Sequence, residues 1–281
     1  MKKILVLTDF SEAARAAASF SVLLAGRCGA RLVLINAWLP HLQIEVRDIA
    51  AYPLEAEWQA RHDPHGQLHA EALRLEQLQE KIQPARPAVI ETLSFRGSLP
   101  RALEANLATI GPDLIVAGLD TATSAHIIRN KITPLNYPLL LVPSRTPSND
   151  FVKTIAFATD LQAGDRQVLL QLKRISAAFQ MGLTICHVSE PAFNMAAAEE
   201  LKIAGFMQAM ALAGIPWSAY EQCYGVSVPQ RVALFAKNKH AGLLALVHHG
   251  HGWLPSVWSD DNEAAILAIN TIPVLLMPAT G

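Results

Sequence analysis

The sequence has few of the features that would indicate a membrane, a secreted scaffold or a nucleic-acid partner. Its 3 cysteines lie far apart, at positions 28, 186 and 223, which is typical of reduced, buried thiols and not of disulfides or a zinc site. No uninterrupted apolar run approaches the ~18 residues that would span a bilayer. Lys and Arg number 23 against 24 Asp and Glu, and no basic block stands out. The composition therefore predicts neither a membrane nor a nucleic-acid partner.

The start of the chain resembles a secretory signal for only a few residues. Lysines precede an apolar run in MKKILVLTDFSEAAR, but Asp9 and Glu12 cut that run short and no small-residue cleavage site follows. We therefore expect a cytoplasmic protein. At 281 residues, 51% of them hydrophobic, the chain has the length and the apolar content for two cores, since domains mostly contain ~100–150 residues.

The second half of the sequence repeats the order of the first. Thr8-Asp9 matches Thr159-Asp160, and Gly29 matches Gly182 with a two-residue change of offset. A polar, turn-rich stretch at 144–150 is typical of a linker. We therefore predict two domains, residues 1–145 and 151–281. Three further segments recur in the same order: 97–103 with 225–234, 112–118 with 241–247, and 137–144 with 272–279.

Each copy alternates short apolar strands with helical patterns. Runs such as ILVLT, LVLIN and LIVAG are apolar on both faces, as is typical of parallel strands covered by helices on two sides. Ser11 is placed to cap the first helix and Gly29 to end it. Alternating strands and helices with right-handed crossovers predict a three-layer α/β/α sandwich in each copy. The first copy also carries an insertion at residues 39–58.

The order of these segments is also that of a known family. The opening KKILVLTDFSE is followed by a helix, GARLVLINA, a helix, PDLIVAG, a helix and YPLLLVP, and the second copy follows the same order. Nearly the whole chain thus resembles the universal stress protein family. The resemblance implies two tandem Rossmann-like (adenine nucleotide α-hydrolase-like) domains, each with a five-stranded parallel sheet of strand order 3-2-1-4-5. It also implies domains that pair through their last strands, so we expect 138–143 and 273–278, two apolar edges, to pair with each other.

Many members of this family bind ATP at the carboxyl ends of strands 1 and 4. Glycines after strand 4 let backbone N–H groups approach the phosphates, and a helix N-terminus adds partial positive charge. For the two strand 1 aspartates, the alternative is a cap on the following helix. By the resemblance, six residues fall on ligand-contacting positions: Asp9 and Asp160 against adenosine, Ala37 and Val188 against the base, and Gly118 and Gly250 as loop glycines.

The phosphate loop departs from the family's pattern in both copies. After Gly118 the loop is six residues shorter than the family's, lacks a further glycine, and places Ala125-His126 where the family has Gly-Ser. In the second copy Val247 replaces the first glycine, and Asp260-Asp261 takes the place of the Gly-Ser pair. Unit charges ~4 Å apart interact by about 4 kcal/mol at an effective dielectric of about 20, which outweighs a few neutral hydrogen bonds of ~1 kcal/mol each. Unless Mg²⁺ bridges the charges, we predict that neither copy is a competent ATP site.

Three histidines follow an apolar run in the second copy. His248, His249 and His251 lie together where a strand should end. Neighbouring strand residues point to opposite faces, and no cysteine lies nearby to complete a tetrahedral set. We therefore favour polar residues of a remodelled nucleotide loop and keep a metal site as the less favoured hypothesis.

The sequence offers no positive evidence for an enzyme, because no spacing resembles a nucleophile elbow or a catalytic triad. The leading hypothesis is a non-enzymatic binding or regulatory protein of the stress response, without a cofactor and with an unidentified protein partner. Association of two chains into a homodimer stays open. The alternative is a nucleotide-binding member that takes ATP, AMP or another adenine nucleotide, with at most slow hydrolysis.

Overall fold

The computed structural model describes residues 1–39, 63–119, 136–146, 153–162, 164–189, 197–225, 227–248 and 272–279. Strands and helices alternate along both halves of the chain. The first half contains β1 (Lys3–Leu7), α1 (Glu12–Cys28), β2 (Arg31–Trp38), α3 (Pro64–Ile82), β3 (Ile90–Arg96), α4 (Leu99–Ile110), β4 (Leu114–Leu119) and β5 (Leu139–Pro143). The second contains β6 (Thr154–Thr159), α6 (Asp165–Ala178), β7 (Gly182–Ser189), α7 (Ala197–Leu212), the 3₁₀ helix η3 (Trp217–Ala219), β8 (Tyr220–Tyr224), α8 (Val228–Asn238), β9 (Leu243–His248) and β10 (Val274–Pro278).

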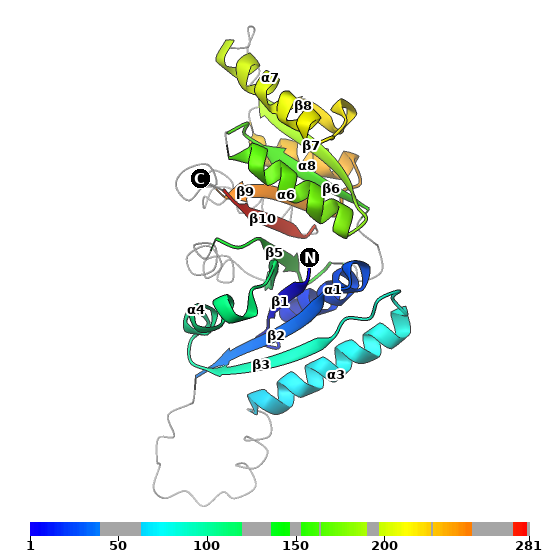
Figure 1. Cartoon of the computed structure of the whole chain (residues 1–281), viewed down its shortest axis with the longest axis vertical. Coiled ribbons are helices and arrows are strands. Elements are labelled where there is room, and N and C mark those ends of the chain that lie inside the picture. Colours follow the sequence, from blue (N-terminus) through cyan, green and yellow to red (C-terminus); the bar gives the residue numbers. More distant parts are fainter. Residues whose placement is uncertain are drawn as a thin grey trace, which may run out of the picture.

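One continuous sheet runs through both halves (Figure 1), in the order β3-β2-β1-β4-β5-β10-β9-β6-β7-β8. Within each half all neighbouring strands are parallel, so the predicted order 3-2-1-4-5 is confirmed twice. The halves join where β10 pairs antiparallel with β5, with Leu275 opposite Leu140. The predicted pairing of the two last strands is therefore confirmed. The boundaries at residues 145 and 151 stay a prediction, because residues 147–152 lie outside the described part.

The first helix begins and ends as its sequence predicts. Ser11 is the N-cap of α1, and its hydroxyl accepts a hydrogen bond from the Ala14 amide at 3.2 Å. Gly29 ends the helix in the left-handed conformation, with φ 66°. That conformation is one in which glycine carries no steric cost, which explains the residue choice.

The predicted match of Gly29 with Gly182 is wrong. Lys3, five residues before Thr8, pairs with Arg31, whereas Thr154, five residues before Thr159, pairs with Gly182. Gly182 therefore corresponds to Arg31, and the position of Gly29 is taken by Gln180, which has φ 54°. A glutamine in the left-handed region thus follows Phe179, the C-cap of α6, and an alignment by glycine alone misplaced this turn.

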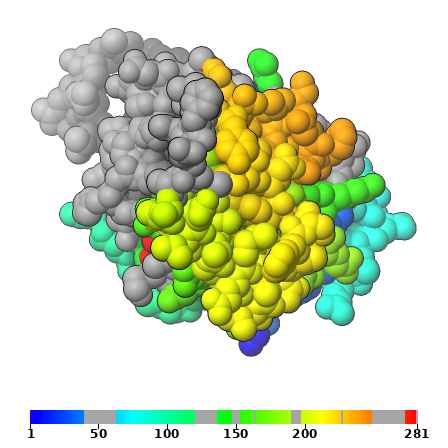
Figure 2. All heavy atoms as spheres, turned by 90° about the horizontal axis from the view of Figure 1, so that it is seen from above, coloured from blue at the N-terminus to red at the C-terminus, as the bar shows by residue number. Residues whose placement is uncertain are grey.

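Helices cover both faces of the sheet and define two apolar layers. One layer packs α1, α3, α6 and α7 against the sheet, and the other packs α4 and α8 against the opposite face. Seen from the end at which α7 lies, the described surface consists mainly of α7, η3 and β8, with α8 beside them (Figure 2). No helix among the described residues is long and apolar enough to cross a membrane.

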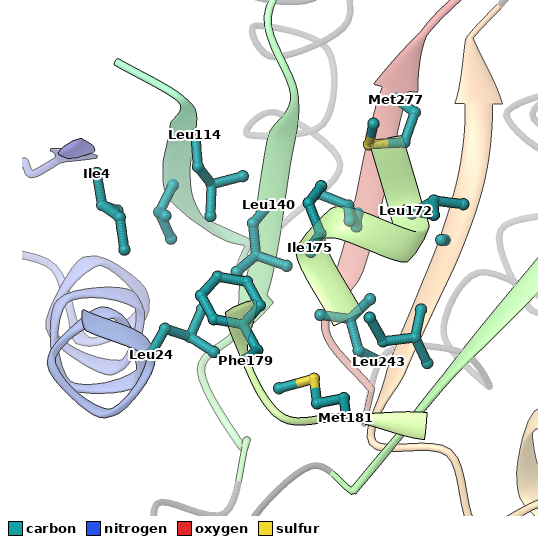
Figure 3. Close-up of a cluster of buried hydrophobic side chains, with 14 of the residues drawn as sticks. Ile4, Leu24, Leu114, Leu140, Leu172, Ile175, Phe179, Met181, Leu243 and Met277 are labelled. Atoms are coloured by element: carbon teal, nitrogen blue, oxygen red, sulfur yellow. The ribbon is translucent and has the colours of Figure 1, made fainter. Parts of the chain in front are cut away.

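The first of these layers is continuous across the two halves. Phe179, which follows α6, is buried and faces Leu24 of α1 and Leu140 of β5 (Figure 3). Arg27 of α1 donates a hydrogen bond from Nη1 to the Phe179 carbonyl oxygen at 2.8 Å. The halves thus share both a core and a polar contact.

Candidate functional site

The topological switch point in each half lies where the strand order reverses beside the first strand. In the first half β1 lies between β2 and β4, and in the second β6 lies between β7 and β9. In open parallel sheets, ligands bind outside the carboxyl ends of the strands at such points. The residues that end β1, β2 and β4, and their counterparts in β6, β7 and β9, therefore define two candidate crevices.

In the first crevice, Asp9 is exposed immediately after β1. Its Oδ1 accepts a hydrogen bond from the Ser11 amide at 3.0 Å, two residues on, which is the geometry of an Asx turn. Ser11 and not Asp9 provides the helix cap. The alternative that Asp9 caps α1 is therefore wrong, and its carboxylate remains exposed at the end of the strand.

Two side chains that sequence reasoning missed lie at the end of β2. The buried Asn36 donates from Nδ2 to the Thr8 carbonyl oxygen at 2.8 Å, which ties β2 to the end of β1. Trp38 donates from its indole nitrogen to Ser94 Oγ at 3.0 Å. Because side chains alternate along a strand, Ala37 faces the other way and packs in the layer covered by α4. The same alternation could have indicated Asn36 and Trp38 from the sequence.

Gly118, in β4, lies directly under the start of α1. A Cβ added at this residue would come 2.3 Å from the Ala13 carbonyl carbon and 2.6 Å from the Ala14 amide nitrogen. These are backbone atoms that no side-chain rotation can move. The absence of a side chain at Gly118 is therefore required by the packing of α1 on β4.

The second half places Val247 at the position of Gly118. Ile4 pairs with Leu114 and Ile155 with Leu243, and each of the two residues in question lies four positions further along its strand. Val247 is 1% exposed.

The helix after the first strand also starts later in the second half. α6 begins at Asp165, six residues beyond Thr159, whereas α1 begins four residues beyond Thr8. A helix starting as early as α1 would meet the valine side chain, so the later start fits the substitution.

The turn into α6 repeats the backbone-to-side-chain bonds of the turn into α1, in which the Phe10 amide donates to Thr8 Oγ1 at 3.1 Å, and adds one bond to Asp165. Buried Thr159 donates from Oγ1 to Asp165 Oδ2 at 2.5 Å and accepts from the Leu161 amide at 2.9 Å. Asp160 accepts at Oδ1 from the Gln162 amide at 3.3 Å, again two residues on. Leu161 has φ 63° and Phe10 has φ 65°, so the two turns share their backbone form.

A polar cluster lies at the carboxyl end of β7, beside the second crevice. His187 places Nδ1 2.9 Å from the Thr159 carbonyl oxygen and Nε2 3.3 Å from Glu199 Oε1, in the first turn of α7. Ser189 donates from Oγ to the same Glu199 oxygen at 2.5 Å, and Gln222 donates from Nε2 to Ser189 at 2.8 Å. The Ser189 hydrogen bond, aided by His187 against a smaller opposing effect of burial, holds the pKa of Glu199 below its usual value. Sequence reasoning missed this cluster.

The cluster contains the residue types of a catalytic triad without its geometry. In a triad the serine hydroxyl is hydrogen-bonded to the histidine, and the histidine to the carboxylate. Here Ser189 donates to Glu199 itself, and the second imidazole nitrogen, Nδ1, faces a backbone carbonyl. A carbonyl only accepts, so Nδ1 carries a hydrogen and cannot act as a base.

Comparisons with known proteins agree with this architecture. Residues 1–121 match the model of the Universal stress protein family. A universal stress protein from Archaeoglobus fulgidus DSM 4304 has a TM-score of 0.61 at 14% identity, covering 99% of this chain and 96% of that one. The first domain is thus similar to the Universal stress protein family.

The same fold extends over both domains, since the Archaeoglobus fulgidus protein covers 99% of this chain. A protein described as functionally unknown, from Pseudomonas aeruginosa PAO1, has a TM-score of 0.59 at 15% identity, covering 99% of this chain and 93% of that one. A universal stress protein from Arabidopsis thaliana with AMP bound is 14% identical and covers 53% of this chain and 97% of that one, with a TM-score of 0.34. None of the curated proteins compared with the chain matches it.

Several predicted positions of the family's loop lie outside the described residues. These are Ala125 and His126 in the first domain, and His249, Gly250, His251, Asp260 and Asp261 in the second. His248 is the last residue of β9. Val188, the predicted base-contacting residue of β7, packs toward α8 as Ala37 packs toward α4. In the described part of the chain, no group of three or more His, Cys, Asp or Glu side chains could hold a metal ion.

Proposed function

We propose that this protein is a universal stress protein that acts as a non-enzymatic regulatory protein of the stress response, and that neither crevice holds a nucleoside triphosphate. The observation that carries the proposal is the buried side chain of Val247, at the position where the family places its first loop glycine. Backbone N–H groups approach phosphate oxygens closely where glycine leaves room, and a valine removes that room.

The first domain supports the same proposal in another way. Its Gly118 is present, but the backbone of α1 lies within 2.6 Å of where a side chain would begin. The space that the missing side chain leaves is therefore filled by the protein itself. The packing of α1 thus gives a reason for Gly118 that requires no contact to phosphate.

Charge in the second crevice points in the same direction. The lowered pKa of Glu199 keeps this carboxylate ionised at neutral pH, beside the end of β7. An anionic phosphate chain near this carboxylate would be repelled, and repulsion between unit charges amounts to about 4 kcal/mol at 4 Å and an effective dielectric of about 20. The protein would then act through a protein partner, as a single chain or as a homodimer.

Titration calorimetry of the full chain with ATP and Mg²⁺ tests the proposal. We expect no binding heat with millimolar ligand. Micromolar binding would overturn the proposal and favour the nucleotide-binding alternative, with at most slow hydrolysis. Metal analysis of protein purified without a polyhistidine tag tests the third hypothesis, and stoichiometric zinc, nickel or copper would favour a site at His248, His249 and His251.

A second candidate function is the binding of an adenosine compound without a triphosphate, such as AMP, in the first domain. It is favoured by the exposed Asp9 carboxylate at the switch point and by Trp38 at the end of the neighbouring strand. Calorimetry with AMP on the wild type and on Asp9→Ala tests it, with Asp160→Ala as the matched control. Heat that disappears only in Asp9→Ala supports this candidate, and equal heat in all three proteins contradicts it.

A further inference from the structure

A cavity of about 380 Å³ lies at the far end of the first domain from its crevice. Its walls are the last turns of α1 and α3, the connection from α3 to β3, and the turn before β7 in the second domain. Because α1 and α3 end where β2 and β3 begin, this is the amino end of the first domain's strands. The cavity is therefore separate from the crevice between β1 and β4.

Glycine and apolar side chains shape the cavity. A Cβ added at Gly26 would lie 2.8 Å from Pro84 Cβ, so the glycine lets the α3–β3 connection pack onto α1. Val22 contributes a buried apolar wall and Gln180 contributes the contact from the second domain. Small-molecule sites are typically concave, mostly apolar, ~300–1,000 Å³ in volume and frequent at domain interfaces.

Two arginines give the cavity its charge. Arg27 and Arg86 both line it, and none of its described lining residues is acidic. The Arg27 guanidinium is held in place by its bond to the Phe179 carbonyl, and burial lowers its pKa. Arg86 lies against Gly29, because the Arg86 Cδ is 3.1 Å from the place that a Cβ added at Gly29 would take. Within the described residues, the Arg86 side chain has neither a hydrogen-bond nor an ion-pair partner.

The fold itself does not require these arginines. In the second domain, α6 and β7 form the same helix–turn–strand unit as α1 and β2. The registers of β2 and β7 place Ala178 at the position of Arg27. Its connection from α7 to β8, residues 213–219, contains no charged residue. There Lys173, from α6, donates to the Ala213 carbonyl oxygen. The two guanidinium groups of the first domain thus have no counterpart in the second.

We propose that this inter-domain cavity binds a small organic anion, with the anionic group on Arg27 and Arg86 and an apolar body against Val22 and Pro84. Guanidinium groups bind carboxylate and phosphate oxygens through strong, charge-assisted hydrogen bonds. A ligand here would contact both domains through Arg27 and Gln180. The site is independent of the two crevices, so it stands whether or not they bind nucleotides.

Calorimetry of the full chain with phenyl phosphate tests the proposal, because this probe combines a dianion with a flat apolar ring. We expect phenyl phosphate to bind at least about tenfold more tightly than phenol or inorganic phosphate, and Arg86→Gln to weaken it at least about tenfold. Arg101→Gln, at an exposed arginine of α4 outside the cavity, is the matched control and should bind as the wild type does. Equal thermal unfolding of the three proteins shows that the fold is kept.

Three results would overturn the proposal. The first is no binding heat at about 10 mM phenyl phosphate, close to the weakest affinity that calorimetry measures. The second is equal affinity in the wild type and in Arg86→Gln. The third is equal affinity for phenyl phosphate and inorganic phosphate, which would mean that the apolar ring gains no contact in the site.

Discussion

His187 stands in the second domain where Asn36 stands in the first, and both residues tie the second strand of their domain to the first. Asn36 Nδ2 donates to the Thr8 carbonyl at 2.8 Å, and His187 Nδ1 lies 2.9 Å from the Thr159 carbonyl. The imidazole has a second nitrogen, which reaches Glu199 in the first turn of α7. In the second domain the same backbone contact is thus joined by a side-chain contact to α7.

Replacing Glu199 by Gln should remove part of the acid sensitivity of the protein. Its pKa is lowered in the folded state, first by the Ser189 hydroxyl and then by His187. A carboxyl group of this kind stabilises the fold above its unfolded pKa of about 4.3, and the stabilisation is lost as pH falls through the lower, folded value. Urea unfolding should therefore show Glu199→Gln less stable than the wild type at pH 7, with the difference shrinking below about pH 4. Glu200→Gln, the exposed neighbour, is the control, and a pH-independent difference for Glu199→Gln would contradict the assignment.

Replacing Gly118 by Ala should destabilise the protein strongly. The new methyl group would lie 2.3 Å from the Ala13 carbonyl carbon, so α1 must shift away from β4. Overpacking of this kind costs about 1–3 kcal/mol or more in the free energy of unfolding. Gly182→Ala is the matched control, because its nearest neighbour would lie at an ordinary 3.6 Å. Urea unfolding curves should separate the two variants, and equal midpoints would mean that α1 does not constrain Gly118.

Much of the fold could be predicted from the sequence, because the signals are local or repeated. Strands apolar on both faces require helices on both sides, and two apolar last strands require a partner, which β5 and β10 provide for each other. Counting along matched strands also predicted that Val247 replaces the loop glycine. The registers of β4 and β9 place Val247 at the position equivalent to Gly118.

The rest depends on contacts between segments that no local pattern connects. Glu199 meets His187 only because the first turn of α7 returns over the end of β7. The cavity at Arg27 includes Gln180 of the other domain in its wall. Gln180 adopts a left-handed conformation, for which the residue type expected from sequence is glycine. For this reason Gly29 was matched with Gly182, although its structural counterpart is Gln180.

The three cysteines should react with alkylating reagents at clearly different rates. All three are free thiols, but only Cys186 is fully buried, whereas Cys28 and Cys223 are half-buried. The predicted burial is therefore confirmed for Cys186 and wrong for the other two. Burial raises the pKa of each thiol above its usual value, which keeps the reactive thiolate scarce. Mass spectrometry after iodoacetamide treatment at pH 8 should find Cys186 unmodified in the folded protein and modified in urea. Labelling of Cys186 as fast as Cys223 without denaturant would contradict the burial.

Replacing Phe179 by Ala should destabilise both domains together. Its side chain is 1% exposed and faces Leu24 and Leu140 of the first domain, so the cavity left behind would lie in the shared layer (Figure 3). Removal of a buried phenylalanine costs about 3–5 kcal/mol. Leu201→Ala, which removes a side chain 74% exposed on α7, should stay within about 0.5 kcal/mol of the wild type. Native-state hydrogen exchange should report the loss in β1 as well as in β7, since one apolar layer spans both halves. A loss of protection restricted to the second domain would mean that the two halves unfold independently, despite the strand pairing that joins them.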